Sequence, residues 1–86
     1  MEKRVGTAII LIEDNKIASQ LNTIISNHSN VIISRQGLPR KNYNIISLVL
    51  EGTTDEIGAL TGQLGRLAHI QVKSVLLKNK NNYEDF

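Results

Sequence analysis

The sequence predicts an α+β protein in which a four-stranded antiparallel sheet carries two helices on one face. Segments rich in β-branched residues alternate with segments whose apolar residues recur at helical spacing. Their order is β-α-β-β-α-β, which is the split βαβ, or ferredoxin-like, arrangement. The chain has 86 residues, of which 41% are hydrophobic. This length suits one small domain, and the composition excludes a disordered chain.

The first half of the chain predicts a strand followed by a helix. Residues 4–13 (RVGTAIILIE) form the strand, and both of its faces are largely apolar, so we expect it to be covered on both sides. Residues 14–29 form the helix, with Asp14 or Asn15 as its N-cap. Its apolar face is marked by the spacing of Ile17, Leu21, Ile24 and His28.

The second half predicts a hairpin, a helix and a last strand. Residues 30–37 and 43–52 form two strands, joined by a loop over residues 37–42 that contains glycine and proline. Residues 53–68 form the second helix, which Thr53, Thr54 or Asp55 can cap, and residues 70–78 form the fourth strand. We therefore expect one domain over residues 1–79 and a polar, disordered tail over residues 80–86.

The sheet contains more apolar side chains than a single helix-covered face requires. The surplus set is Ile10, Ile12, Ile46, Leu48, Leu50, Val75 and Leu77. A bare apolar sheet face is unfavourable in water. The sequence therefore predicts a homo-oligomer, a dimer or a tetramer, in which this face is buried against another copy.

The composition excludes several classes of function. The chain has no cysteine, which excludes disulfides, thiolate metal sites and a cysteine nucleophile. The net charge of +2 is scattered and aromatic residues are scarce, so we expect no nucleic-acid partner. No apolar run is long enough to span a membrane, and no signal peptide is evident, so we expect a cytoplasmic protein. No nucleophile–base pair is suggested, so we expect no catalytic residue, no cofactor and no enzyme activity.

The second predicted helix contains three glycines, Gly58, Gly62 and Gly65, each of which costs about 1 kcal/mol relative to alanine inside a helix. A phosphate-binding loop is a poor explanation, because the glycines lie within the helix and no P-loop lysine follows them. The core face is formed by Ile57, Leu60, Leu64 and Leu67, and the glycines form a separate stripe beside it. We expect a close neighbour on this stripe, from another subunit, the first helix or a partner protein; tolerated glycines at exposed positions are the alternative.

The two histidines, His28 and His69, do not predict a metal site within one chain. The β-α-β-β-α-β path places them at opposite ends of the sheet, and a metal usually needs more ligands. His28 also lies on the apolar helix face, where a half-buried, hydrogen-bonded histidine is the simpler interpretation. A site shared between chains remains the alternative.

Three connections are predicted to meet at one end of the sheet and to form a polar rim. The candidate ligand-binding residues there are Asp14, Asn15, Lys16, Arg35, Gly37, Arg40 and Arg66. Cations and backbone N–H groups suit an anion or a carboxylate. An ordinary solvated rim is the alternative.

Several segments resemble one small family. The segment GTTDEIGALTGQLGRL followed by VKS, and the hairpin motif Arg35-Gln36-Gly37-Leu38-Pro39, are similar to regulators assigned to the iron-only hydrogenase system. The resemblance covers residues 2–78. It implies an ACT-like, ferredoxin-like fold and a regulatory role, and it suggests a hydrogenase-maturation protein as a partner. ACT-like domains generally bind small ligands, often amino acids, at interfaces near the first strand–helix loop.

We therefore expect a small, non-enzymatic regulatory or binding module that oligomerises through its sheet. It would bind a small ligand or a protein partner at an interface. Two alternatives remain: a purely structural interaction module without a ligand, and a weak metal sensor that uses histidines from different chains.

Overall fold

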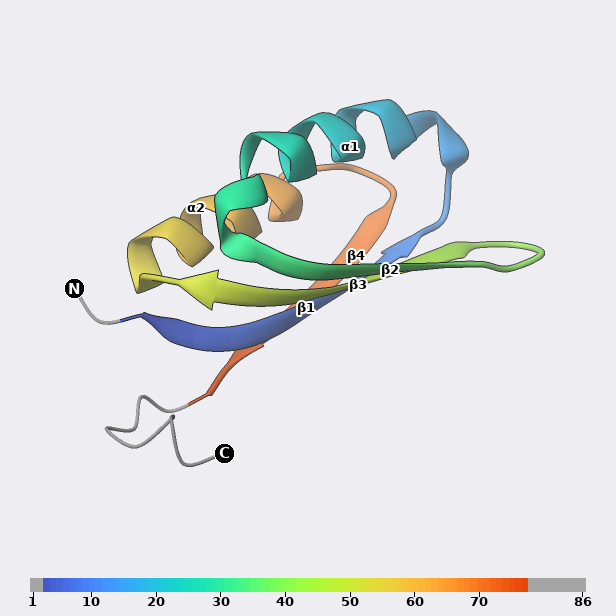
Figure 1. The fold of residues 1–86 in the computed structure, drawn as a ribbon. Helices are drawn as coiled ribbons and strands as arrows, with labels where there is room; N and C mark the ends of the chain where they lie inside the picture. The colour runs from blue at the N-terminus through green and yellow to red at the C-terminus, as the bar shows by residue number, and fades with distance from the viewer. Residues whose placement is uncertain (1–2, 78–86) are drawn as a thin grey trace.

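The computed structural model describes residues 3–77 and confirms the predicted α+β class. Its elements are β1 (Arg4–Ile12), α1 (Ala18–Asn27), β2 (Ile32–Pro39), β3 (Asn44–Gly52), α2 (Thr54–Gly65) and β4 (Ile70–Leu76). Two short 3₁₀ helices, η1 (Asn15–Ile17) and η2 (Ser29–Val31), flank α1. Both α-helices lie on the same face of the sheet (Figure 1). The predicted tail, residues 80–86, lies outside the described residues.

The four strands form one antiparallel sheet in the order β2-β3-β1-β4. β1 is central, so Ile10 lies opposite Ile46 of β3 and opposite Val72 of β4. β2 and β4 are the edge strands. A bulge between Ile32 and Ser34 shifts the register of β2 against β3.

β1 and β4 approach each other closely at Gly6. A Cβ atom added there would lie 2.6 Å from the carbonyl oxygen of Val75 and 2.6 Å from Cδ2 of Leu76. The close approach of β4 therefore explains why glycine occupies this position. Backbone conformation does not explain it, because the φ angle of Gly6 is not positive.

The core lies between the sheet and the two helices and is aliphatic. Its members are Ala8, Ile10, Ile12, Ile17, Leu21, Ile25, Val31, Ile46, Leu48, Leu50, Ile57, Leu60 and Leu64. The predicted core face of α2 is confirmed, with Leu67 partly buried at its end. The face predicted for the first helix is displaced, because Ile25 is buried while Ile24 is only partly so.

The first helix is shorter than predicted, because its predicted ends adopt 3₁₀ geometry. Asp14 does act as a cap, but it caps η1: its Oδ1 accepts a hydrogen bond from the Lys16 backbone N–H at 2.9 Å. α1 itself begins after Ile17, which makes no side-chain cap. Val31, predicted to lie in the second strand, belongs to η2, and its side chain is buried in the core.

The start of α2 confirms Thr53 as the cap among the three predicted candidates. The Thr53 Oγ1 accepts a hydrogen bond from the Glu56 N–H at 3.1 Å, and a Glu56 carboxylate oxygen accepts one from the Thr53 N–H at 2.9 Å. This reciprocal pair is a capping box, which satisfies two backbone donors that the helix cannot use. The hydrogen bond that the carboxylate accepts from the Thr53 N–H, with a further contribution from the Thr53 side chain, lowers the pKa of the Glu56 carboxyl from its ordinary value, because hydrogen bonding favours the charged form.

The sheet face opposite the helices is only partly the one that the sequence predicted. We call it the open face; its members are Val5, Thr7, Ile9 and Leu11 of β1, Ser34, Gln36 and Leu38 of β2, Ile45, Ser47, Val49 and Glu51 of β3, and Gln71, Lys73, Val75 and Leu77 at β4 and its end. Of the seven residues predicted to be surplus, Ile10, Ile12, Ile46, Leu48 and Leu50 are buried beneath the helices, so their assignment was wrong. The strand alternation places them on the helix side.

The open face still exposes apolar side chains. Ile9 is 51% exposed, Val75 60% and Leu77 56%. We expected β1 to be covered on both sides. Within residues 3–77 of this single chain, the helices cover one side of β1, and its other side is exposed.

Candidate functional site

The three connections that were predicted to meet at one end of the sheet do lie side by side. The Glu13 N–H donates to the carbonyl oxygen of His69 at 3.0 Å, and Gln71 Nε2 donates to Glu13 Oε1 at 3.1 Å. On the other side, Asn44 Nδ2 donates to Asn15 Oδ1 at 2.8 Å. These hydrogen bonds join the start of η1 to both the hairpin and the start of β4.

The predicted ligand residues are not equivalent within this end of the molecule. Asp14 and Asn15 already have partners in the chain. Lys16 and Arg40 are exposed, and the Arg40 N–H closes the hairpin by donating to the Tyr43 carbonyl at 2.9 Å. Arg66 is the C-cap of α2. Their binding role stays a prediction.

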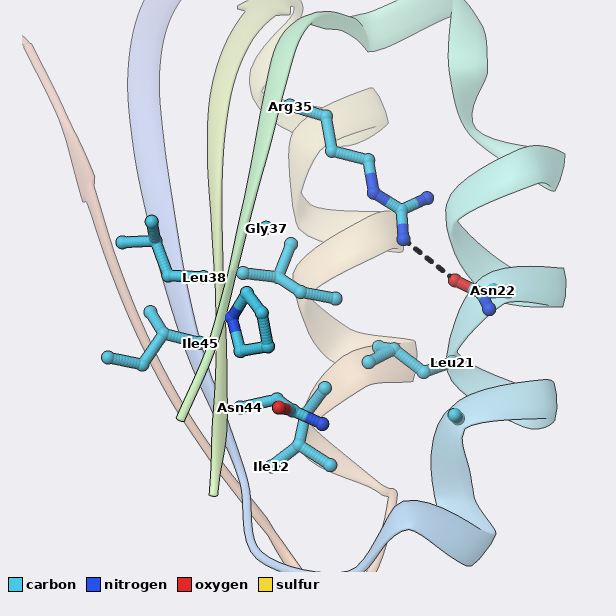
Figure 2. Close-up of a pocket in the computed structure, with 11 residues that line it drawn as sticks. Ile12, Leu21, Asn22, Arg35, Gly37, Leu38, Asn44 and Ile45 are labelled. Carbon is cyan, nitrogen blue, oxygen red and sulfur yellow. Dashed lines mark hydrogen bonds between the residues drawn. The ribbon is translucent and has the colours of Figure 1, made fainter. Parts of the chain in front are cut away.

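Arg35 and Gly37 lie together in a groove between α1 and β2, with a volume of about 310 Å³. Its lining residues are Ile12, Ala18, Leu21, Asn22, Arg35, Gly37, Leu38, Pro39, Asn44, Ile45 and Ile46. Figure 2 shows Leu21 and Asn22 on the helix side of this groove, and Leu38 and Ile45 with their side chains on the far side of the strands.

The sheet register explains why Arg35 enters the groove. Arg35 pairs with Leu48, which is fully buried beneath the helices, so both side chains are on the helix side of the sheet. The Arg35 guanidinium reaches across to α1, where Nη2 donates to the Asn22 Oδ1 at 2.8 Å (Figure 2). Gly37 leaves room beside it, since a Cβ atom there would meet no heavy atom within 4 Å.

The open face has its own shallow hollow of about 150 Å³, lined by Ile9, Leu11, Ile45, Gln71 and Lys73. Its floor is aliphatic and its rim carries one cation. This composition suits contact with another apolar surface better than it suits a polar ligand.

The three glycines of α2 form an exposed stripe. A Cβ atom at Gly58, Gly62 or Gly65 would meet no heavy atom within 4 Å. The first helix is therefore not the close neighbour of this stripe, and that part of the expectation was wrong. α1 contacts α2 through the core side chains on another side of the helix.

The histidines are placed as the sequence predicted. His28 is half-buried at the end of α1, and its Nδ1 lies 2.9 Å from the Ile24 carbonyl oxygen. His69 is exposed beside the start of β4 and has a φ angle of 65°. Over residues 3–77, no group of three or more histidine, aspartate or glutamate side chains is arranged to hold a metal ion.

The sequence interpretation missed Asn22, Asn44 and Pro39 as groove residues. The alternation of β2 carried a signal for part of this set, because Arg35, Gly37 and Pro39 occupy every second position and must share a face. Asn22 carried none, since exposed asparagines on helices are common and the facing strand was unknown.

Comparison with solved structures shows an ACT-like, ferredoxin-like fold. The ACT domain of a GTP pyrophosphokinase from Chlorobium tepidum superposes with a TM-score of 0.68 over 96% of each chain, at 19% identity. The C-terminal domain of the MgtC protein from Mycobacterium tuberculosis gives a TM-score of 0.66 at 9% identity, over 92% of this chain and 93% of the other. At these identities the likeness shows the fold alone. Neither helix within residues 3–77 combines the length and apolar character needed to cross a membrane.

The family is defined more closely by two further matches. The uncharacterized protein TM1266 from Thermotoga maritima is 40% identical, with a TM-score of 0.83, over 90% of this chain and 100% of the other. Residues 4–74 match the TM1266-like family model, described as "Iron-only hydrogenase system regulator, putative". The chain belongs to this family. No curated protein is significantly similar to it.

Proposed function

We propose that this protein is a small, non-enzymatic regulatory module that assembles with its own copies through the open face and responds to a small ligand. The exposure of Ile9, Val75 and Leu77 on one sheet face carries the assembly part of this proposal. The family description and the ACT-like fold support a regulatory role, and the cytoplasm is the location that we propose for it. A hydrogenase-maturation protein is the partner that the family description favours.

The charges on the open face also favour a second copy as the occupant. The face carries one cation, Lys73, and one anion, Glu51, on different strands. Such a face is neutral and can pair its own opposite charges when two copies meet about a two-fold axis.

The size of the face sets the strength expected of the assembly. Four strands about 4.8 Å apart and a central strand about 30 Å long cover roughly 570 Å² per copy, or about 1,100 Å² for two copies. Stable interfaces bury about 1,200–2,000 Å² in total. We therefore expect a dimer that dissociates at low micromolar concentration, unless further contacts extend the interface.

Sedimentation velocity at micromolar protein tests the assembly. Ile9→Glu should convert the dimer to a monomer, because it places a carboxylate at the centre of the contact. The fold should survive, since Ile9 is 51% exposed and lies opposite Lys73, which can pair with the new charge. Gln20→Glu adds the same charge on the exposed side of α1 and should leave the dimer intact. A wild-type protein that stays monomeric at micromolar concentrations would refute assembly through the open face.

The metal-sensor alternative has less support. Hydrogen bonding to the Ile24 carbonyl already engages one ring nitrogen of His28. A purely structural module differs from our proposal in one measurable property, because it would bind no small ligand in an NMR titration.

A further inference from the structure

We propose that the groove between α1 and β2 binds a small monoanion with a branched aliphatic body, and that Arg35 holds its carboxylate. This inference rests on the ligand-binding part of the proposed function, and it can be tested separately from assembly, because the Arg35 side chain lies on the helix side of the sheet, away from the open face. The groove is contained within a single chain.

The charge of the groove selects an anion. Among the lining residues within 3–77, Arg35 is the one charged side chain, and none is acidic. A ligand with an ammonium group beside its carboxylate would therefore bring a cation that no lining carboxylate could pair. The groove thus favours a simple carboxylate over a zwitterionic amino acid with the same carbon skeleton.

The hydrogen bonding of Arg35 leaves it ready for such a ligand. Its present partner in the groove is the neutral amide oxygen of Asn22, which engages Nη2. A carboxylate accepts two parallel hydrogen bonds from a guanidinium, and these charge-assisted bonds are roughly twice as strong as neutral ones. The anion would replace the Asn22 oxygen, and the freed Asn22 amide could donate to the same carboxylate.

The shape and lining of the groove select the apolar body. Arg35, Gly37 and Pro39 share the helix side of β2, and Arg35 and Pro39 are about 13 Å apart at the rise of an extended strand. Opposite them, Ala18 of α1 is half-buried and supplies an aliphatic contact, and the buried side chains of Leu21 and Ile12 form the apolar layer behind it. Gly37 leaves space in the middle, so a short branched chain can lie along the strand without displacing a side chain.

Titration of ¹⁵N-labelled protein with 4-methylpentanoate, followed by two-dimensional NMR, tests the proposal. Saturable shifts should centre on the amides of Arg35, Gly37 and Asn22. Leucine has the same skeleton with an added ammonium group, and 4-methylpentanamide lacks the charge. Both should bind at least about tenfold more weakly. Equal binding of leucine, or shifts confined to the open face, would overturn the assignment.

Variants locate the site and separate it from the rim. Arg35→Gln should weaken binding at least about tenfold by removing the charge, and Gly37→Leu should block the groove in a space that the fold leaves empty. Lys41→Gln removes an exposed cation from the hairpin outside the groove and should not change the affinity. Unchanged binding in Arg35→Gln, or loss in Arg40→Ala or Arg66→Ala alone, would overturn the proposal. Sedimentation of the same samples reports assembly separately, so either part can fail alone.

Discussion

Replacing Gly6 by alanine tests the close approach of β1 and β4. The added methyl group would lie 2.6 Å from the Val75 carbonyl oxygen, which belongs to the backbone and cannot rotate away, and 2.6 Å from Cδ2 of Leu76. The two strands must therefore move apart locally. Overpacking of this kind costs about 1–3 kcal/mol. Alanine also reduces the entropy of the unfolded chain, which offsets about 0.4–1 kcal/mol of that cost. We expect a net loss of roughly 1–2 kcal/mol in the free energy of unfolding.

Thermal and urea denaturation at one fixed protein concentration measure this loss, because assembly makes stability depend on concentration. In a domain of this size, a loss of 1–2 kcal/mol lowers Tm by about 4–16 °C. Gly37→Ala is the matched control, since it makes the same change in a strand where the new Cβ meets nothing within 4 Å. It should leave stability unchanged or raise it by up to about 1 kcal/mol. Equal stability of the two variants would refute the steric reasoning.

Three further substitutions and one control test the capping box and the glycine stripe. Thr53→Ala should lower the free energy of unfolding by about 1 kcal/mol, because it removes the cap. Thr54→Ala is the control: this residue is exposed and lies one position inside the helix, so the free energy should change by less than about 0.5 kcal/mol. Urea denaturation measures both changes. Because the folded pKa of Glu56 is lowered, its stabilising contribution is present above the ordinary carboxyl pKa and is lost as pH falls through the folded value. Glu56→Gln should therefore be less stable than wild type at neutral pH, and the two should converge in acid. Gly62→Leu should stabilise the exposed helix by about 0.5–1 kcal/mol; unchanged assembly and partner binding in this variant would show that the glycine stripe is idle.

The sequence predicted the order of elements because each strand and helix has its own periodicity. It misplaced the open face because β1 and β3 are apolar on both sides, so hydrophobicity alone could not decide which alternate set the helices cover. The register places Ile10, Ile46 and Val72 on one face, and the packing of the helices on that face buries Ile10 and Ile46; both are tertiary properties. The 3₁₀ ends of α1 were missed for a related reason. Burial of Ile17 and Val31 in the core determines the path of those turns, and no local pattern encodes it.

The candidate groove was predictable only from its strand side. Arg35 and Gly37 were selected for their chemistry, and their spacing of two already placed them on one face. Arg40 and Arg66 were selected with them because the topology brings their connections to the same end of the sheet. Neither lines the groove. The topology thus indicates at which end of the fold a site lies. Which cations can contact the same ligand depends on the direction of each side chain within its strand.

Strand β2 connects the groove to the sheet pairing on which the open face depends. Arg35 and Gly37 occupy helix-side positions of this strand. The alternate residues, Gln36 and Leu38, pair with Ser47 and Ile45 on the side of the open face. A ligand that draws Arg35 away from Asn22 therefore acts on the same edge strand that borders the assembly surface. If 4-methylpentanoate tightens the dimer by some factor, dimerisation must tighten binding of the ligand by the same factor, because the two equilibria are linked. Measuring affinity below and above the dissociation concentration of the dimer gives that factor directly, and a value of one would mean that the two surfaces act independently.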